Sequence, residues 1–304
     1  MMDKNMNRYQ KLNERALDRL EKQFERELIR NYQIALKELR AKIAYAYERY
    51  DGSWIEMQRY NRLTKLEKEI AEEIRKLTGK NALTLKKGMM DVYEESFYRT
   101  AWSLTNTVKA DLGFTMLDRK LVEKAIHNPL DRVGFLQRNR DNQARLTRQL
   151  KEHLAQSLIQ GEAYQKAAQR IKERMDVGAT NVIRIAQTEM HRTRNNAKLD
   201  AMEEGAELGI SIKKMWLATA DGATRESHQE LDGVTINLDE DFEGEEGSGP
   251  APGMLGSASE DINCRCTMIE VVDGFKPTTR RVRDVGLVEF ATYKEYKEKG
   301  LIQK

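Results

Sequence analysis

The chain has 304 residues, of which 39% are hydrophobic and 33% are charged, and its formal net charge is +3. This length can bury a core, and only four prolines argue against a disordered chain and for long helices. The small net charge does not by itself predict a nucleic-acid-binding protein, and no apolar run approaches the ~20 residues that cross a bilayer. Two cysteines spaced one residue apart give no disulfide framework and no apolar signal core opens the sequence, so we expect synthesis in a reducing cytoplasm.

Helical spacing dominates the first part of the chain. Neither Gly nor Pro occurs between 7 and 50, and apolar residues recur there at helical intervals: Leu12, Leu20, Phe24, Leu28, Leu36, Leu39 and Ile43. We predict helices over 7–50, over 54–77 with an end near 78–81, over 85–108, and a shorter one between Asp118 and Asn128. The apolar faces of these helices need later helices or a partner protein to cover them.

A basic stretch follows. Between Arg132 and Arg174 ten Lys and Arg residues stand against four Asp and Glu, in two predicted helices that break near Gly161. A turn is expected over 176–180, and a further helix over 181–204. The basic side chains either form a solvated helix face or contact a polyanion such as DNA. Candidates for DNA contact are Arg132, Arg138, Arg140, Arg145 and Arg148. Aromatic residues are nearly absent here, which argues against a platform for stacking single-stranded bases.

The hydrophobic period then changes from helical to strand spacing. Strands are predicted over 211–218, 234–238 and 262–272, with one or two helical turns over 224–231 and a turn at Asp232-Gly233. The stretch 239–261 has eight acidic residues and no basic one, so we predict a mobile loop that contributes nothing to the core.

These elements predict an α+β protein. An elongated, mainly helical N-terminal region, 1–130, would bind a partner. A smaller domain of helices and antiparallel sheet, 131–273, would follow, and a tail, 274–304, is basic at first and then polar.

The two cysteines raise the question of a metal site. On a strand, Cys264 and Cys266 would face the same side, with Arg265 opposite. Two thiolates could bind zinc with His228 as the third ligand. A fourth ligand would come from Asp221, His191 or Glu189. The alternative is a pair of buried structural thiols beside a hydrogen-bonded histidine, which the absence of the common Cys-x2-Cys spacing favours.

The helix before the strands carries polar residues on two faces. One face has Arg184, Thr188, His191 and Asn195, and the other has Glu189, Arg192 and Asn196. These faces are either solvated and salt-bridged, or part of a buried network that locks the helix to the sheet, with Arg225 as a further partner. An acid beside a histidine also permits general acid–base chemistry. Because the sequence has no Ser-His-Asp elbow, phosphate-binding Gly loop or His-Glu-x-x-His motif, we predict no enzyme and no catalytic residue.

The order of these pieces resembles the phage head morphogenesis family of the Mu F type, whose members are also called minor head or minor capsid proteins. The resemblance covers about 140–273, and the helical region before it is similar, more diffusely, to the upstream part of minor head proteins of tailed phages. The matching positions are Arg184, Thr188, Glu189, Arg192, Trp216, Asp221, Thr224, Arg225, His228, Leu231, Asp232, Gly233, Asn263, Cys264, Arg265 and Cys266.

The resemblance implies a low-copy bacteriophage protein in the head interior at the portal vertex, assembled in the host cytoplasm. Its implied partners are the portal protein, scaffold and capsid proteins and packaged double-stranded DNA, and its implied roles are head morphogenesis and DNA packaging or ejection. Some relatives carry a toxin or ADP-ribosyltransferase domain after the last strand, and 274–304 is too short for one. Two alternatives remain: a zinc-stabilised module or zinc enzyme built on His228, Cys264 and Cys266, and a stand-alone DNA-binding protein.

Overall fold

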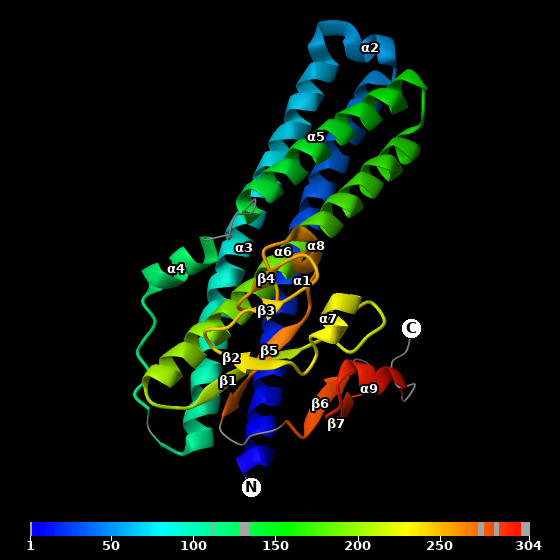
Figure 1. Cartoon of the computed structure of the whole chain (residues 1–304). Helices are drawn as coiled ribbons and strands as arrows, with labels where there is room; N and C mark the ends of the chain where they lie inside the picture. Colours follow the sequence, from blue (N-terminus) through cyan, green and yellow to red (C-terminus); the bar gives the residue numbers. More distant parts are fainter. Residues whose placement is uncertain (1, 111, 128–133, 273–276, 283–285, 299–304) are drawn as a thin grey trace. The chain divides into compact units, whose positions relative to one another are not determined.

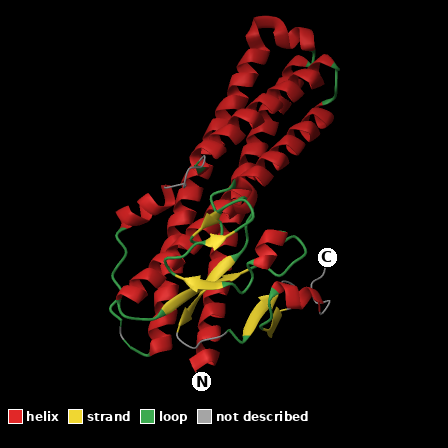
Figure 2. Cartoon of the chain, viewed as in Figure 1, coloured by secondary structure: helices red, strands yellow, loops and turns green. Residues whose placement is uncertain are grey.

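The structure is a computed structural model that describes residues 2–110, 112–127, 134–272, 277–282 and 286–298 (Figure 1). Its helices are α1 (Met2–Tyr50), α2 (Trp54–Gln58), the 3-10 turn η1 (Arg59–Asn61), α3 (Arg62–Val108), α4 (Arg119–His127), α5 (Phe135–Ile159), α6 (Tyr164–Glu207), α7 (Glu226–Glu230), α8 (Ala258–Asp261) and α9 (Tyr293–Glu298). Its strands are β1 (Ile212–Leu217), β2 (Thr235–Asn237), β3 (Phe242–Glu243), β4 (Ser248–Gly249), β5 (Thr267–Val272), β6 (Thr279–Val282) and β7 (Gly286–Glu289). Long helices precede short antiparallel strands (Figure 2), which confirms the predicted α+β class.

The chain divides into two compact units. We call Met1–Glu21, Gly88–Arg132 and Gln187–Lys304 the sheet unit, and Lys22–Lys87 and Val133–Ala186 the helical unit. Helices α1, α3 and α6 each contribute residues to both. The units are discontinuous in sequence, whereas the predicted domains 1–130, 131–273 and 274–304 are continuous stretches, and those ranges stay a prediction.

The helical unit is built from segments of α1, α3, α5 and α6 that bury their apolar stripes. Asn142 on α5 connects three of these helices, because its Nδ2 donates to the Tyr32 hydroxyl on α1 and to the Gly178 carbonyl on α6, both at 3.1 Å. Asn31 on α1 donates to the Asn81 side chain on α3 at 3.2 Å. The predicted stripe on α1 is correct at Phe24, Leu28, Leu39 and Ile43, all 2% exposed or less, and wrong at Leu12, which is 43% exposed.

Two predicted helix boundaries are wrong, because α3 continues through 78–81 and α6 continues through 176–180. The helix continues at Thr78, where the hydroxyl donates to the Ile74 carbonyl at 2.8 Å. Gly178 permits close packing, since a Cβ there would lie 2.9 Å from Leu146 Cδ2 and 3.0 Å from Tyr32 Cε1. The predicted break near Gly161 is confirmed, and this residue has a φ of +61° between α5 and α6.

In the sheet unit an antiparallel sheet of order β2-β1-β5 forms the layer against which helices pack. Trp216 pairs with Met268 across β1 and β5. One core cluster joins the sheet to α3 and α6: Leu104, Leu199, Met202, Ile212, Ala251, Met254, Met268 and Val272. On α6, Lys198 Nζ donates to the Met268 carbonyl at 3.0 Å, so a buried lysine also attaches the helix to the edge of β5.

The prediction that the acidic stretch 239–261 is a loop without core residues is wrong. It forms β3, β4 and α8, and Phe242, Ala251 and Leu255 are 1% exposed or less. Gly249 lets the chain fold back on itself, because a Cβ there would lie 1.9 Å from the Met254 carbonyl oxygen. Most of the acidic side chains point outward, which is why composition alone suggested a loop.

The last predicted strand begins later than expected. The structure starts β5 at Thr267, and residues 262–266 form a turn and a short irregular segment instead of the strand start predicted at 262. Asn263 has a φ of +59°, which a strand does not allow, and its N–H donates to the Thr188 hydroxyl at 3.2 Å. The tail forms the hairpin β6–β7, which was not predicted, and α9, where its polar end has helix-like sequence. Of the basic residues at the start of the tail, Lys276 and Arg283 lie outside the described residues.

Candidate functional site

His228 on α7 and the two cysteines of the turn before β5 converge in the sheet unit; we call these three residues the Cys–His cluster. The His228 Nδ1 atom lies 3.4 Å from Cys266 Sγ and 3.8 Å from Cys264 Sγ. The donor atoms of the cluster all lie within 4.8 Å of one another. All three residues are 3% exposed or less, and the Trp216 ring lies edge-on to the imidazole at a centroid distance of 5.3 Å.

The turn, and not a strand, brings the two sulfurs together. Cys264 N donates to the Asp261 carbonyl at 3.2 Å, and Asn195 Nδ2 donates to the Cys266 carbonyl at 3.1 Å. Arg265 forms a two-pronged ion pair with Asp221, with one arm at 2.8 Å.

The cluster has a distinct charge distribution. The hydrogen bond with Cys264 and the contact with His228 together lower the pKa of Cys266 to about 5, against the effect of burial. The pKa of Cys264 is raised by its hydrogen bond to Cys266 and by burial. Burial alone would lower the pKa of His228, but Cys266 and the carboxylate of Glu260 outweigh burial and raise it. These shifts favour the thiolate form of Cys266 and the thiol form of Cys264.

Glu260 is a member of the site that sequence reasoning missed. Its Oε2 lies 2.7 Å from His228 Nε2, although the ring N–H is not aligned for a regular hydrogen bond. Ser227 Oγ donates to the same carboxylate at 3.1 Å. The sequence does mark this residue, because Ser257-Ala-Ser-Glu260 has the Ser-x-x-Glu pattern of a capping box. In the structure Ser257 Oγ accepts from Glu260 N at 3.2 Å. The Glu260 side chain contacts His228 instead of completing the capping box.

The three residues suggested as a fourth metal ligand are engaged elsewhere. Asp221 pairs with Arg265. Glu189 pairs with Arg192 at 3.1 Å. The Nε2 of His191 lies 3.5 Å from a carboxylate oxygen of Glu21.

The predicted polar lock includes contacts between α6 and the turn before β5, through Thr188 with Asn263 N and Asn195 with the Cys266 carbonyl. Arg192, beyond its pair with Glu189, donates to the Ile126 carbonyl at 3.2 Å, which attaches α6 to α4. Arg225 donates to the carbonyls of Glu260 and Ile262 and so braces the turn before the cysteines. Arg184 is exposed and lies in the helical unit.

The turn pair Asp232-Gly233 is placed as the sequence predicts, and its aspartate does more than turn the chain. Asp232 Oδ1 accepts from Ala218 N at 2.7 Å, and Oδ2 pairs with the buried Arg280 from the tail. Gly233 has a φ of +85°, and its N–H donates to the Trp216 carbonyl at 2.9 Å.

A charge network around the buried Arg194 escaped the sequence reasoning. Arg194 on α6 is 2% exposed and pairs with Asp18 at 3.0 Å, with Glu21 at 3.2 Å and with Glu14. No sequence signal marks these pairs, because more than 170 positions separate the partners.

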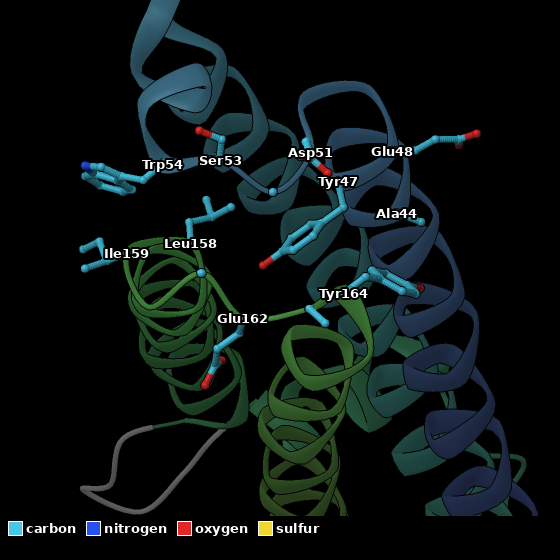
Figure 3. Close-up of a pocket in the computed structure, with 13 residues that line it drawn as sticks. Ala44, Tyr47, Glu48, Asp51, Ser53, Trp54, Leu158, Ile159, Glu162 and Tyr164 are labelled. Carbon is cyan, nitrogen blue, oxygen red and sulfur yellow. The ribbon is translucent and has the colours of Figure 1, made fainter.

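The predicted DNA contacts lie on α5 in the helical unit. Arg140, Arg145 and Arg148 are exposed, Arg138 is half-buried, and Arg132 lies outside the described residues. The same unit has a hollow of about 670 Å³ between the end of α1 and the α5–α6 connection, lined by Tyr47, Trp54 and Tyr164 among others (Figure 3). None of the predicted site residues lines it.

Within the described residues, every helix is too short or too polar to span a membrane.

Comparison with known proteins gives one family match and two relatives. Residues 148–269 match the family model described as Phage Mu protein F like protein. The chain is 29% identical to the Minor head protein GP7 of Bacillus phage SPP1 over 295 residues, which covers 94% of this chain and 95% of that protein.

A second relative is the NAD(+)--arginine ADP-ribosyltransferase EFV of Enterococcus faecalis (strain ATCC 700802 / V583). It is 33% identical over 243 residues, which covers 77% of this chain but only 50% of that protein. No solved structure matches. The family resemblance carried by the helix, the turn and the cysteine motif is thereby confirmed. Residues 148–269 of the chain thus belong to the Phage Mu protein F like family of phage head morphogenesis, and the whole chain is similar to a minor head protein of that family.

Proposed function

We propose that the chain is a minor head protein of a tailed phage, present in few copies in the virion head. It binds the portal protein at the portal vertex, together with scaffold or capsid proteins, and takes part in DNA packaging or ejection. The observation that carries this proposal is the match to a minor head protein along 94% of this chain and 95% of that relative. A match of this extent includes the long helices and not only the cysteine motif.

Burial supports a structural and not a catalytic role for the Cys–His cluster. A catalytic acid, base or nucleophile needs access to its substrate, whereas these three side chains and Glu260 are 3% exposed or less. The acids on α6 and after β1 that could serve as bases are engaged with arginines. The match to the ADP-ribosyltransferase leaves half of that protein uncovered, so its activity is not proposed for this chain.

Exposed arginines on α5 support contact with packaged DNA. Arg145 and Arg148 lie three residues apart on one side of the helix and project into solvent. Guanidinium groups on an exposed helix bind phosphates without reading sequence, and such binding weakens as salt rises.

The main test is the location of the protein during assembly. The chain should be co-expressed with its phage's portal, scaffold and major capsid proteins, and purified procapsids should be analysed by quantitative mass spectrometry. We expect the protein in procapsids at a few copies per portal, and its loss from particles assembled without portal. Equal incorporation with and without portal would contradict the portal assignment, and absence from procapsids would contradict the head assignment.

DNA contact has its own test. Replacing Arg145 and Arg148 by Glu should reduce the slope of log affinity against log salt by about 0.9 for each lost phosphate contact. The matched control replaces Lys65 and Lys68, which are exposed on α3 of the same unit, by Glu. Equal losses in both double variants would indicate a bulk charge effect and would rule out a DNA face on α5.

A further inference from the structure

We propose that His228, Cys264 and Cys266 form a zinc site that joins α7 to the turn before β5. The proposal does not depend on the phage head assignment, since it follows from the arrangement of three buried donor atoms. The ligands would be the Nδ1 atom of the histidine and the two sulfur atoms.

The distances between the donor atoms fit a tetrahedral zinc ion. Bonds of about 2.3 Å to sulfur and 2.0–2.1 Å to nitrogen place N and S ligands roughly 3.6 Å apart in a tetrahedron. The two N···S distances in the cluster, 3.4 and 3.8 Å, bracket this value. The third separation, between the sulfurs, is below 4.8 Å, and a pair of zinc-bound sulfurs lies roughly 3.8 Å apart. The side chains therefore need little movement to bind the ion.

The second ring nitrogen of His228 is also placed as in a metal site. A metal ion on Nδ1 fixes the ring proton on Nε2, and Nε2 lies 2.7 Å from the Glu260 carboxylate. Histidine ligands in proteins usually direct their second nitrogen to a carboxylate or a carbonyl, which sets the tautomer and makes the ligand more basic. Ser227 and the backbone N–H of Glu245 hold the carboxylate in place.

The buried thiolates that the cluster can form favour a bound cation. Burying a thiolate is unfavourable unless a cation accompanies it, and two buried thiolates without a metal repel each other. Zn²⁺ neutralises both sulfurs, and the protons that the thiols and the Nδ1 atom carry leave to solvent on binding. The described residues supply three ligands to this ion, and we assign its fourth position to a water molecule.

The ion would stabilise a part of the fold that has little else to hold it. Helix α7 spans only Glu226–Glu230, and β2 next to it spans only Thr235–Asn237. Both cysteines, Trp216 and Phe242 belong to one small core cluster. A metal link across this cluster would tie α7 to the turn before β5 where the core is small.

The test uses the full chain purified without chelator after growth with zinc. Elemental analysis should give close to one zinc per chain, and the Co²⁺-substituted protein should show the thiolate-to-cobalt charge-transfer band in the near ultraviolet. His228→Ala and the double variant Cys264→Ser/Cys266→Ser should lose the zinc. The control His153→Ala, in the helical unit, should keep it.

The cobalt spectrum of the unmodified chain keeps the proposal testable if the variants do not fold. Zinc that persists in the cysteine double variant would be adventitious and would overturn the proposal. So would a cobalt spectrum without the charge-transfer band. A Cys264–Cys266 disulfide in the purified protein, seen as the loss of two protons in mass and of both free thiols, would overturn it as well.

Discussion

The two units of the chain differ in how many charged groups they bury. The helical unit buries mainly amides and hydroxyls, such as Asn81, Asn139 and Asn142, and the carboxylate of Glu162. The sheet unit buries amides and hydroxyls too, and with them many charged groups, among them Arg194, Lys198, Asp232, Glu260, Glu270 and Arg280. A buried amide needs one or two hydrogen bonds, whereas a buried charge needs an opposite charge as well.

This difference predicts which kind of mutation each unit is sensitive to. Removing one partner of a buried ion pair leaves the other charge uncompensated, and the cost exceeds what the pair itself contributed. In an apolar bundle the cost of a substitution depends instead on the volume that it adds or removes. The sheet unit should therefore respond mainly to charge changes, and the helical unit mainly to volume changes.

The largest effect is expected from Arg194→Ala in the sheet unit. The change leaves Glu14, Asp18 and Glu21 close together without their shared cation. The free energy of unfolding, measured by urea denaturation, should fall by about 3–5 kcal/mol.

Arg148→Ala is the matched control, because this arginine is 72% exposed and lies 3.9 Å from Glu152. We expect a change within about 0.5 kcal/mol. Similar losses in the two variants would show that burial of charge does not distinguish the sheet unit.

A smaller effect is expected from a pair of glycines within the helical unit. Gly178→Ala places a methyl group against Leu146 and Tyr32, and this overpacking should lower stability by about 1–3 kcal/mol. Gly79→Ala meets nothing within 4 Å and should raise stability by about 0.5–1 kcal/mol, because alanine favours the helix. Thermal unfolding of both variants measures the difference, and a gain of stability in both would contradict the packing role of Gly178.

The smallest effect is expected at Glu162 in the α5–α6 connection. Its hydrogen bonds with Lys166 and Arg170 lower its pKa from 4.5 to about 2. A lowered pKa means that the folded state binds the proton less tightly than the unfolded state does, so the contribution to stability is complete above pH 4.5 and is lost as the pH falls toward 2. The melting temperature of Glu162→Gln should therefore lie below that of the unmodified chain at neutral pH and converge with it in acid. A difference that does not change with pH would disprove this contribution.

The sequence predicts elements whose signal is local. The long α1, the break at Gly161, the strands β1 and β2 and the turn at Asp232-Gly233 all follow from hydrophobic period and turn residues close to them in sequence. The false helix ends at 78–81 and 176–180 have the opposite origin. Residues that often end helices lie there, but contacts with distant helices keep the backbone helical.

The candidate site was predictable in its residues but not in its geometry. The Cys-x-Cys spacing and a nearby histidine were sufficient to name His228, Cys264 and Cys266, although the strand on which the argument relied begins only at Thr267. Glu260 was missed because its acidic neighbours suggested a solvent-exposed loop. Arg194 was missed because its partners lie in α1, and nothing local to either segment indicates that they meet.

Because α1, α3 and α6 belong to both units, recombination between related genes is constrained. The helical unit consists of Lys22–Lys87 and Val133–Ala186, so exchanging it intact between two related phages requires four crossover points. Three of them fall inside α1, α3 and α6, where a junction must preserve the helical phase of both parents. Recombination should therefore transmit the two units together, and new segments should be acquired at the ends of the chain and not between the units.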